Sequence, residues 1–162
     1  MAVHKIYIED FEEEDYHVIA IHTTLEDYRL AYFLNRELEI RLHKSDFDIQ
    51  SQVKEGATSF ARFTFEDEEK VITWDLVQNK NEVEDSGNNL TTDLFSNSNN
   101  SFSSLAYLLP EYKKVDFLLK IENAANEIDL NEIVTKISAV DGINMVYNVD
   151  KDKIKSKNNL IF

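Results

Sequence analysis

The clearest structural signal in this sequence is a pair of alternating runs joined by a short acidic linker. Phe60, Phe63 and Phe65 precede the linker EDEEK, and the run VITWDLV follows it. Aromatic and β-branched residues with this alternation favour two antiparallel strands joined as a hairpin. The polar alternates predict that one face of the hairpin meets water; they are Arg62, Thr64, Thr73 and Asp75.

The residues before the hairpin predict a strand, a helix and a second strand. The run Tyr16–His22 is short, apolar and β-branched, as buried strands are. Thr23 and Glu26 have the spacing of a capping box, and an amphipathic helix with Tyr28 and Tyr32 on its apolar face is expected to about Leu38. The second strand is indicated by Ile40, Leu42 and Phe47.

The C-terminal third predicts one further strand–helix–strand unit. A strand begins near Val115, and Asp129 has the position of a helix N-cap. Gly142 suits a left-handed residue at the end of that helix. In the last strand a period of two puts Ile143, Met145, Tyr147 and Val149 on one face.

The expected order is therefore β-α-β-β-β-loop-β-α-β in a single α+β domain over residues 1–162. We expect a mostly antiparallel sheet with two helices packed on one face. The C-terminal half has the order of a ferredoxin-like unit. Within the domain, residues 80–106 are expected to form a flexible loop, because eleven of the nineteen residues 86–104 are Asn or Ser. Leu94, Phe95 and Phe102 are expected to dock only weakly.

Charge and composition exclude several classes of function. The chain has 17 Lys and Arg against 31 Asp and Glu, a formal charge of −14. Because nucleic-acid affinity depends on basic residues that neutralise phosphates, no direct nucleic-acid binding is expected unless the fold gathers a basic patch. The sequence has no cysteine, no evident signal peptide and no long apolar run, which predicts a cytoplasmic protein with no membrane contact.

No pattern of catalytic, cofactor-binding or metal-binding residues stands out. His17 and His22 lie five apart in a strand, so their side chains point to opposite faces and do not chelate one ion. Three glycines are too few for a Gly-rich phosphate loop, and the acidic runs lack the spacing of an EF-hand. We therefore expect no catalytic residue, no cofactor and no metal site.

The first helix carries the best candidates for a binding surface. Tyr28, Arg29, Asn35 and Arg36 lie on it, and Arg29 and Arg36 share a face. Two arginines on one face suit a carboxylate or an acidic partner. The alternative is that they form surface salt bridges with Glu26 and Glu37.

Pro110, the only proline, stands between the Asn/Ser-rich stretch and an apolar run. Proline fixes its own φ and holds the residue before it extended. It is expected to set the angle at which the chain enters the strand near Val115, with residues 111–114 as the turn. The sequence leaves open whether the Leu109–Pro110 bond is cis or trans.

The segment LPEYKKVDF, Leu109–Phe117, resembles the signature I-P-E-x-x-x-V-D-Y of the IPExxxVDY family of Bacteroidetes. The sequence departs from it in having Leu109 for Ile and Phe117 for Tyr. Three further stretches are similar to that family: LEDYRLAYFLNREL, FTFEDEE and KSKNNLIF. The resemblance implies a bacterial lineage and a fold, but no mechanism. The matched signature residues, expected to be structural, are Leu109, Pro110, Glu111, Val115, Asp116 and Phe117.

These observations favour a non-enzymatic protein-interaction or adaptor domain. Its partner would be another protein or a second copy, and Leu160, Ile161 and Phe162 would dock on the chain's own sheet or on a second subunit. The alternative is a regulatory domain of the ACT type that binds a small ligand. An enzyme would require Arg29, Glu111 and Asp116 to converge in one pocket. At Asp116 we expect a carboxylate that accepts from backbone N–H groups or pairs with an arginine.

Overall fold

The computed structural model describes residues 15–54, 56–85 and 104–162. Its largest element is a six-stranded sheet in the order β11-β1-β10-β6-β5-β2, with every neighbouring pair antiparallel. In chain order the strands are β1 (Tyr16–Thr23), β2 (His43–Lys44), β5 (Arg62–Asp67), β6 (Ile72–Gln78), β10 (Phe117–Glu122) and β11 (Ile143–Asn148). The predicted α+β class and antiparallel sheet are confirmed.

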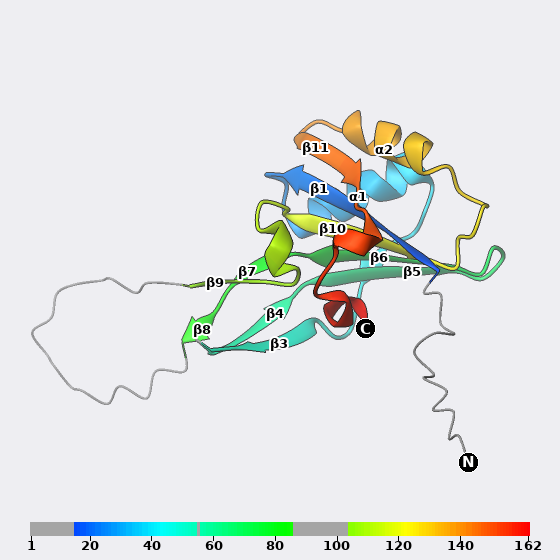
Figure 1. Ribbon diagram of the computed structural model, residues 1–162. Helices are drawn as coiled ribbons and strands as arrows, with labels where there is room; N and C mark the ends of the chain where they lie inside the picture. Colours follow the sequence, from blue (N-terminus) through cyan, green and yellow to red (C-terminus); the bar gives the residue numbers. More distant parts are fainter. Residues whose placement is uncertain (1–14, 55, 86–103) are drawn as a thin grey trace, which may run out of the picture.

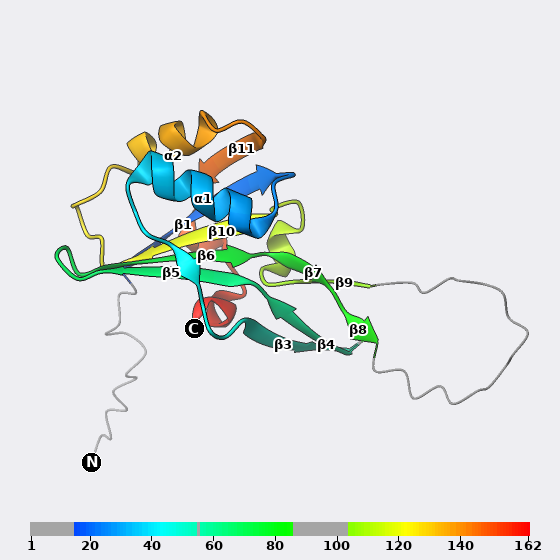
Figure 2. The same cartoon turned by 180° about the vertical axis from the view of Figure 1, so that it is seen from behind.

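Both helices cover the same face of this sheet, as expected (Figure 1). They are α1 (Asp27–Leu38) and α2 (Leu130–Ser138), and Figure 2 shows them side by side above the strands. Their buried residues meet those of the sheet in a helix-side core. Among its members are Ile19, Ile21, Leu30, Leu34, Trp74, Leu76, Leu119, Ile133 and Ile137.

Four of the strands repeat the ferredoxin-like arrangement in both halves of the chain. The strands β10 and β11 flank β1 and are joined through α2, which is a split β-α-β unit. The strands β1 and β6 flank β10 in the same way, with α1 following β1. The likeness therefore extends beyond the C-terminal half, and β2 and β5 lengthen the sheet at its far edge.

Several short strands were not expected from the sequence. A three-stranded sheet joins β3 (Ile49–Val53), β4 (Gly56–Phe60) and β8 (Glu84–Asp85), and a separate pair joins β7 (Lys80–Glu82) with β9 (Leu105–Tyr107). These segments are short or lack an apolar alternation, so periodicity does not reveal them. The loop predicted over residues 80–106 is therefore partly strand, because both of its ends belong to β7, β8 and β9. Residues 86–103, with Leu94, Phe95 and Phe102, lie outside the described residues.

The second face of the sheet, which was predicted to meet water, does so only in part, since Arg62, Thr64 and Thr73 are half-buried and Asp75 is buried. The segment after β11 crosses beneath the sheet with two short 3₁₀ helices, η3 (Lys151–Lys153) and η4 (Lys157–Leu160) (Figure 1). Buried residues of this segment, of the sheet and of the turn before β10 form a tail-side core. Its members include Val18, Ala20, Val77, Leu109, Val115, Leu118, Ile154 and Leu160. The polar alternate Asp75 is therefore only 1% exposed.

The two helix starts differ in how well the sequence predicted them. Asp129 caps α2 as expected, because its side chain accepts from the backbone N–H groups of Asn131 and Glu132. The capping box at α1 is wrong: Glu26 is the N-cap residue, and the Thr23 hydroxyl instead donates to the Gly142 carbonyl over 2.6 Å. Tyr28 and Tyr32 are exposed rather than part of the apolar face.

Details of the strands also depart from the period-of-two prediction. A register shift opposite His22 and Thr23 interrupts β11, so Ile143 packs toward the helix-side core while Tyr147 and Val149 meet the tail-side core. Ile40 and Leu42 are buried but precede β2 rather than form it, and Phe47 is 82% exposed. Phe60 belongs to β4, not to the hairpin of β5 and β6.

Candidate functional site

The signature segment, Leu109–Phe117, forms the turn that leads from β9 into β10. Pro110 opens a 3₁₀ helix, η2 (Pro110–Tyr112), after an extended Leu109, which is the role expected of this proline. The Leu109–Pro110 bond is trans, since no cis peptide occurs in the described chain. Leu109, Val115 and Phe117 are buried and anchor the turn, and Pro110 is exposed.

Asn79, at the end of β6, holds this turn in place. Its buried amide donates to the carbonyls of Tyr112 and Val115, each over 2.9 Å, and its carbonyl oxygen accepts from the Leu109 N–H over 2.9 Å. All three bonds hold backbone groups of the turn, and the Tyr112 carbonyl also accepts from the Val115 N–H over 3.0 Å. Sequence reasoning missed this residue, and its only signal was an Asn directly after a buried strand.

Glu111 fixes the C-terminal tail to the signature segment. Its Oε1 accepts from the N–H groups of Lys155 and Ser156 over 2.8 Å, and its Oε2 accepts from the Ser156 hydroxyl over 3.0 Å. Burial acts to raise the pKa of Glu111, but the hydrogen bonds from Ser156 and Lys155 outweigh it and lower that pKa. Two of the stretches that resemble the IPExxxVDY family, LPEYKKVDF and KSKNNLIF, are thus in direct contact.

Asp116 joins three strands at the other end of the turn. Its Oδ2 accepts from the N–H of Thr23 at the end of β1 over 2.9 Å, as one of its expected roles requires. Its Oδ1 lies 2.7 Å from Lys80 Nζ in β7, so its charged partner is a lysine and not the expected arginine. Asp116 therefore ties β10 to β1 and β7.

The apolar C-terminus docks on the chain's own sheet, the first of its two expected positions. Leu160 is 2% exposed, and its carbonyl accepts from the buried Lys120 Nζ over 2.6 Å. The ring of Phe162 contacts two cations, with its centroid 4.8 Å from Lys120 Nζ and 4.9 Å from Arg62 Cζ. Ile161 stays 69% exposed.

An open hollow of about 580 Å³ lies between the signature turn and β11. We call it the signature groove. It is lined by His22, Pro110, Glu111, Tyr112, Lys113, Lys114, Val115, Met145 and Tyr147. Burial raises the pKa of both Tyr112 and Tyr147, so both hydroxyls stay protonated near neutral pH. The Tyr147 hydroxyl lies 3.2 Å from His22 Nε2, and Met145 is 56% exposed beside it.

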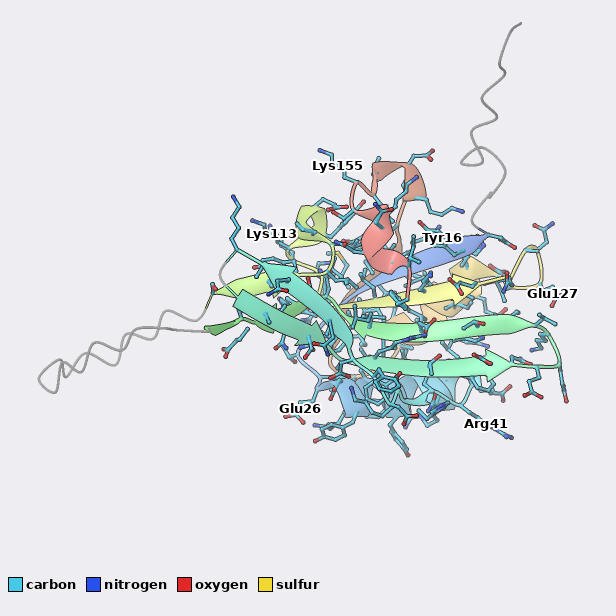
Figure 3. The ribbon with its side chains drawn as sticks, turned by 90° about the horizontal axis from the view of Figure 1, so that it is seen from below. Tyr16, Glu26, Arg41, Lys113, Glu127 and Lys155 are labelled. Carbon is cyan, nitrogen blue, oxygen red and sulfur yellow. The ribbon has the colours of Figure 1, made fainter. Side chains whose placement is uncertain are left out.

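Lysines border this groove on one side. Lys113 and Lys114 are exposed, and so is Lys155, whose backbone N–H donates to Glu111 in the same turn. Figure 3 shows Lys113 and Lys155 projecting from the same end of the molecule. A local basic region therefore exists on a chain whose formal charge is −14.

The four binding candidates on α1 do not form one surface. The Asn35 amide is used internally, because it donates to the Leu42 carbonyl and accepts from the Leu42 N–H. Arg36 forms a salt bridge with Glu37 over 2.8 Å, which is one of the two salt bridges expected if the arginines do not bind a partner. Tyr28 and Arg29 are exposed, and a hydrogen bond with Glu26 raises the pKa of Tyr28.

Two of the three residues that an enzyme would require border different hollows. Glu111 borders the signature groove, whereas Asp116 borders a separate hollow of about 400 Å³ at the start of α1. Arg29 lines neither of them. Within residues 15–54, 56–85 and 104–162, no group of three or more His, Cys, Asp or Glu is placed to hold a metal ion. No helix in this part of the chain is both long and apolar enough to cross a membrane.

Comparison of the chain with protein-family models, with curated proteins and with solved structures gave no match in any of the three. The likeness of Leu109–Phe117 to the IPExxxVDY signature therefore stays a resemblance.

Proposed function

We propose that this chain is a non-enzymatic, cytoplasmic protein-interaction domain, and that the signature groove binds an extended acidic segment of another protein. The observation that carries this proposal is the pairing of an apolar floor with a lysine rim. The exposed Met145 and the half-buried Tyr147 supply the apolar surface, and Lys113 and Lys114 supply the positive charge. An apolar hollow with a few charged groups at its border is the usual form of a recognition site.

Charge favours an acidic occupant over a basic or neutral one. Lys113 and Lys114 border the groove, while the chain as a whole has a formal charge of −14. A partner segment with Asp or Glu beside an aromatic or aliphatic residue would satisfy both the rim and the floor. The net charge disfavours a long phosphate backbone, which would approach the acidic surfaces as well.

Two features support a role without catalysis. The Glu111 carboxylate already accepts three hydrogen bonds from the tail, so it is not free to act as a general base. Tyr112 and Tyr147 have raised pKa values, which opposes their use as nucleophiles or bases near neutral pH. In this proposal Glu111, Tyr112 and Tyr147 therefore contribute contact surface rather than reactive groups.

The test is a peptide array in which acidic segments with one aromatic residue are compared with lysine-substituted copies. We expect the acidic set to bind and the basic set not to bind. In fluorescence anisotropy, Lys113→Glu with Lys114→Glu should weaken the best peptide by at least about tenfold. The matched control, Arg41→Glu with Lys70→Glu, changes two exposed cations elsewhere and should have little effect. Preference for an RNA oligonucleotide, or equal loss in the control, would contradict the proposal.

A second candidate function is a regulatory domain that binds a small ligand. The observation in its favour is the strand order β11-β1-β10-β6 with both helices on one face, the ferredoxin-like arrangement of ACT-type domains. A thermal-shift screen with amino acids and related metabolites separates this candidate from the first. A ligand that raises the Tm and still does so in the Lys113→Glu, Lys114→Glu variant would favour it.

A further inference from the structure

The two edges of the six-stranded sheet are protected to very different degrees. At one edge, β2 has only two residues, His43 and Lys44, and the lysine pairs with Asp48. Short strands and lysines are the usual means by which proteins keep an edge from pairing. At the other edge, β11 has six residues, Ile143–Asn148, with no charge and no proline.

The backbone of β11 presents hydrogen-bonding groups outward at two positions. The Val149 N–H donates to the Val18 carbonyl, so Val149 forms a hydrogen-bonded pair with β1. Hydrogen-bonded pairs alternate along an antiparallel ladder, which makes Tyr147 and Met145 the next residues that bond to β1. The N–H and C=O groups of Val146 and Asn148 therefore point away from the sheet.

The regular part of this strand is centred on Tyr147. The register shift opposite His22 and Thr23 disturbs the beginning of β11, and pairing is uninterrupted from Met145 to Asn148, with Val149 bonded beyond it. Tyr147 is the middle of this five-residue stretch. When this stretch is paired antiparallel with the same stretch of a second copy, all five residues overlap only if Tyr147 faces Tyr147.

We propose that two copies of the chain associate by antiparallel pairing of their β11 edges, with Tyr147 facing Tyr147 of the second copy. Val146 of each copy then exchanges both backbone hydrogen bonds with Asn148 of the other. The exposed Met145 comes to lie opposite Val149 of the second copy, on the same face as the signature groove. A second copy suits this edge because the stretch is self-complementary about Tyr147, and residues 143–149 bring no charge into a contact between two chains of formal charge −14.

In this arrangement Tyr147 lies beside the two-fold axis of the proposed dimer. Directly opposed residues that are not hydrogen-bonded have Cα atoms about 4.5 Å apart, which is the closest approach in a sheet. Two tyrosine rings at that position stack across the interface, a favourable cross-strand pair. The two signature grooves become neighbours on one face of the dimer.

The first experiment removes a hydrogen bond between the two copies and leaves the pairing of β11 with β1 intact. Asn148→Pro deletes an N–H that points away from β1, a position that tolerates proline. Sedimentation should show the wild-type chain as a dimer that dissociates on dilution, and Asn148→Pro should raise its Kd at least about tenfold with little change in Tm. The matched control is Gln50→Pro in β3, an exposed position of the other uncharged edge, which should stay dimeric.

The second experiment reads the register directly. Because the chain has no cysteine, a single introduced cysteine bonds only to its copy. Tyr147→Cys should form a disulfide quickly under mild oxidation, since opposed residues meet the required Cα separation. Met145→Cys is the control: its side chain is well exposed, but the pairing keeps the two copies of residue 145 apart.

Three results would overturn the inference. They are a wild-type chain that is monomeric up to its solubility limit, a dimer that survives Asn148→Pro but not Gln50→Pro, and cross-linking no faster at position 147 than at 145. None of them depends on Lys113 or Lys114, so a failure here is distinct from a failure of the peptide-binding proposal.

Discussion

The two faces of the six-stranded sheet are buried in contrasting ways. The helix-side core consists of apolar residues under two amphipathic helices. On the tail side, the residues of the sheet include Asp75 and Lys120, which are 1% and 4% exposed. The cover there is a tail with two short 3₁₀ turns. The comparison teaches that a face with polar alternates can still be a core when each charge has a partner.

The partners on the tail side are specific. Arg62 lies 2.9 Å from Asp75, and Lys120 contacts Glu122, the Leu160 carbonyl and the ring of Phe162. A buried charge without such partners would be strongly destabilising. The tail therefore supplies both apolar cover and part of the solvation that Lys120 loses. The two faces should consequently respond differently to substitution.

The largest effect is expected from removing residues 157–162. This exposes the Leu160 site and leaves Lys120 with one hydrogen-bond partner fewer, so the free energy of unfolding should fall by roughly 5 kcal/mol. The comparator on the other face is Ile137→Ala in α2, which creates one cavity and should lower it by about 3 kcal/mol. Urea denaturation measures both. If the truncation lowered the free energy of unfolding by less than Ile137→Ala does, the tail would contribute little packing energy to this face.

The next effect contrasts two neighbours on β10 that point to opposite faces. Lys120→Met should lower the free energy of unfolding by about 2 kcal/mol, because the Leu160 carbonyl and Glu122 lose their partner. Leu119→Met, the same replacement toward the helices, should lower it by less than about 1.5 kcal/mol. Adding Glu122→Gln to Lys120→Met should recover part of the loss. Purely additive losses would show that the pair does not interact.

The smallest effect concerns the bond between the signature segment and the tail. Glu111→Gln should lower the free energy of unfolding by about 1 kcal/mol at pH 7, because two backbone donors lose a charged acceptor. The pKa of Glu111 is lowered in the folded chain, so its contribution is complete above the unfolded pKa. The difference from wild type should therefore shrink as the pH falls below about 4.3. A difference that is constant from pH 7 to pH 3 would remove Glu111 from this role.

The helix-side core was predictable because period and capping determine it locally. The stripe Leu130, Ile133, Val134 and Ile137, and the cap at Asp129, could be identified without any distant contact. Five of the six strands of the main sheet followed from the same kind of pattern. The exception is β2, which follows the apolar residues Ile40 and Leu42 that were expected to form it. The tail-side core was not predictable, because its burial depends on contacts between residues far apart in sequence, such as Lys120 with Leu160.

The residues of the candidate site also separate into those whose role depends on local sequence and those whose role depends on distant contacts. Pro110 and Asp116 could be assigned structural roles from backbone chemistry alone. The role of Glu111 was hidden because its donors, Lys155 and Ser156, lie more than forty positions further along the chain. The arginines of α1 attracted interest for their spacing, but spacing does not report that Arg36 is paired or that the Asn35 amide is occupied. Asn79 carried no recognisable pattern at all.

The position of β1 has a consequence for how the chain folds. Its partners in the sheet are β10 and β11, so Tyr16 pairs with Glu122 and Ile19 with Asn148. Such pairings give a high contact order, because about a hundred residues of loop entropy must be lost before the first of them forms. Refolding from denaturant should therefore take milliseconds to seconds rather than microseconds. In stopped-flow fluorescence, Trp74 in β6, beside β10, would report the slow step as the central strands come together.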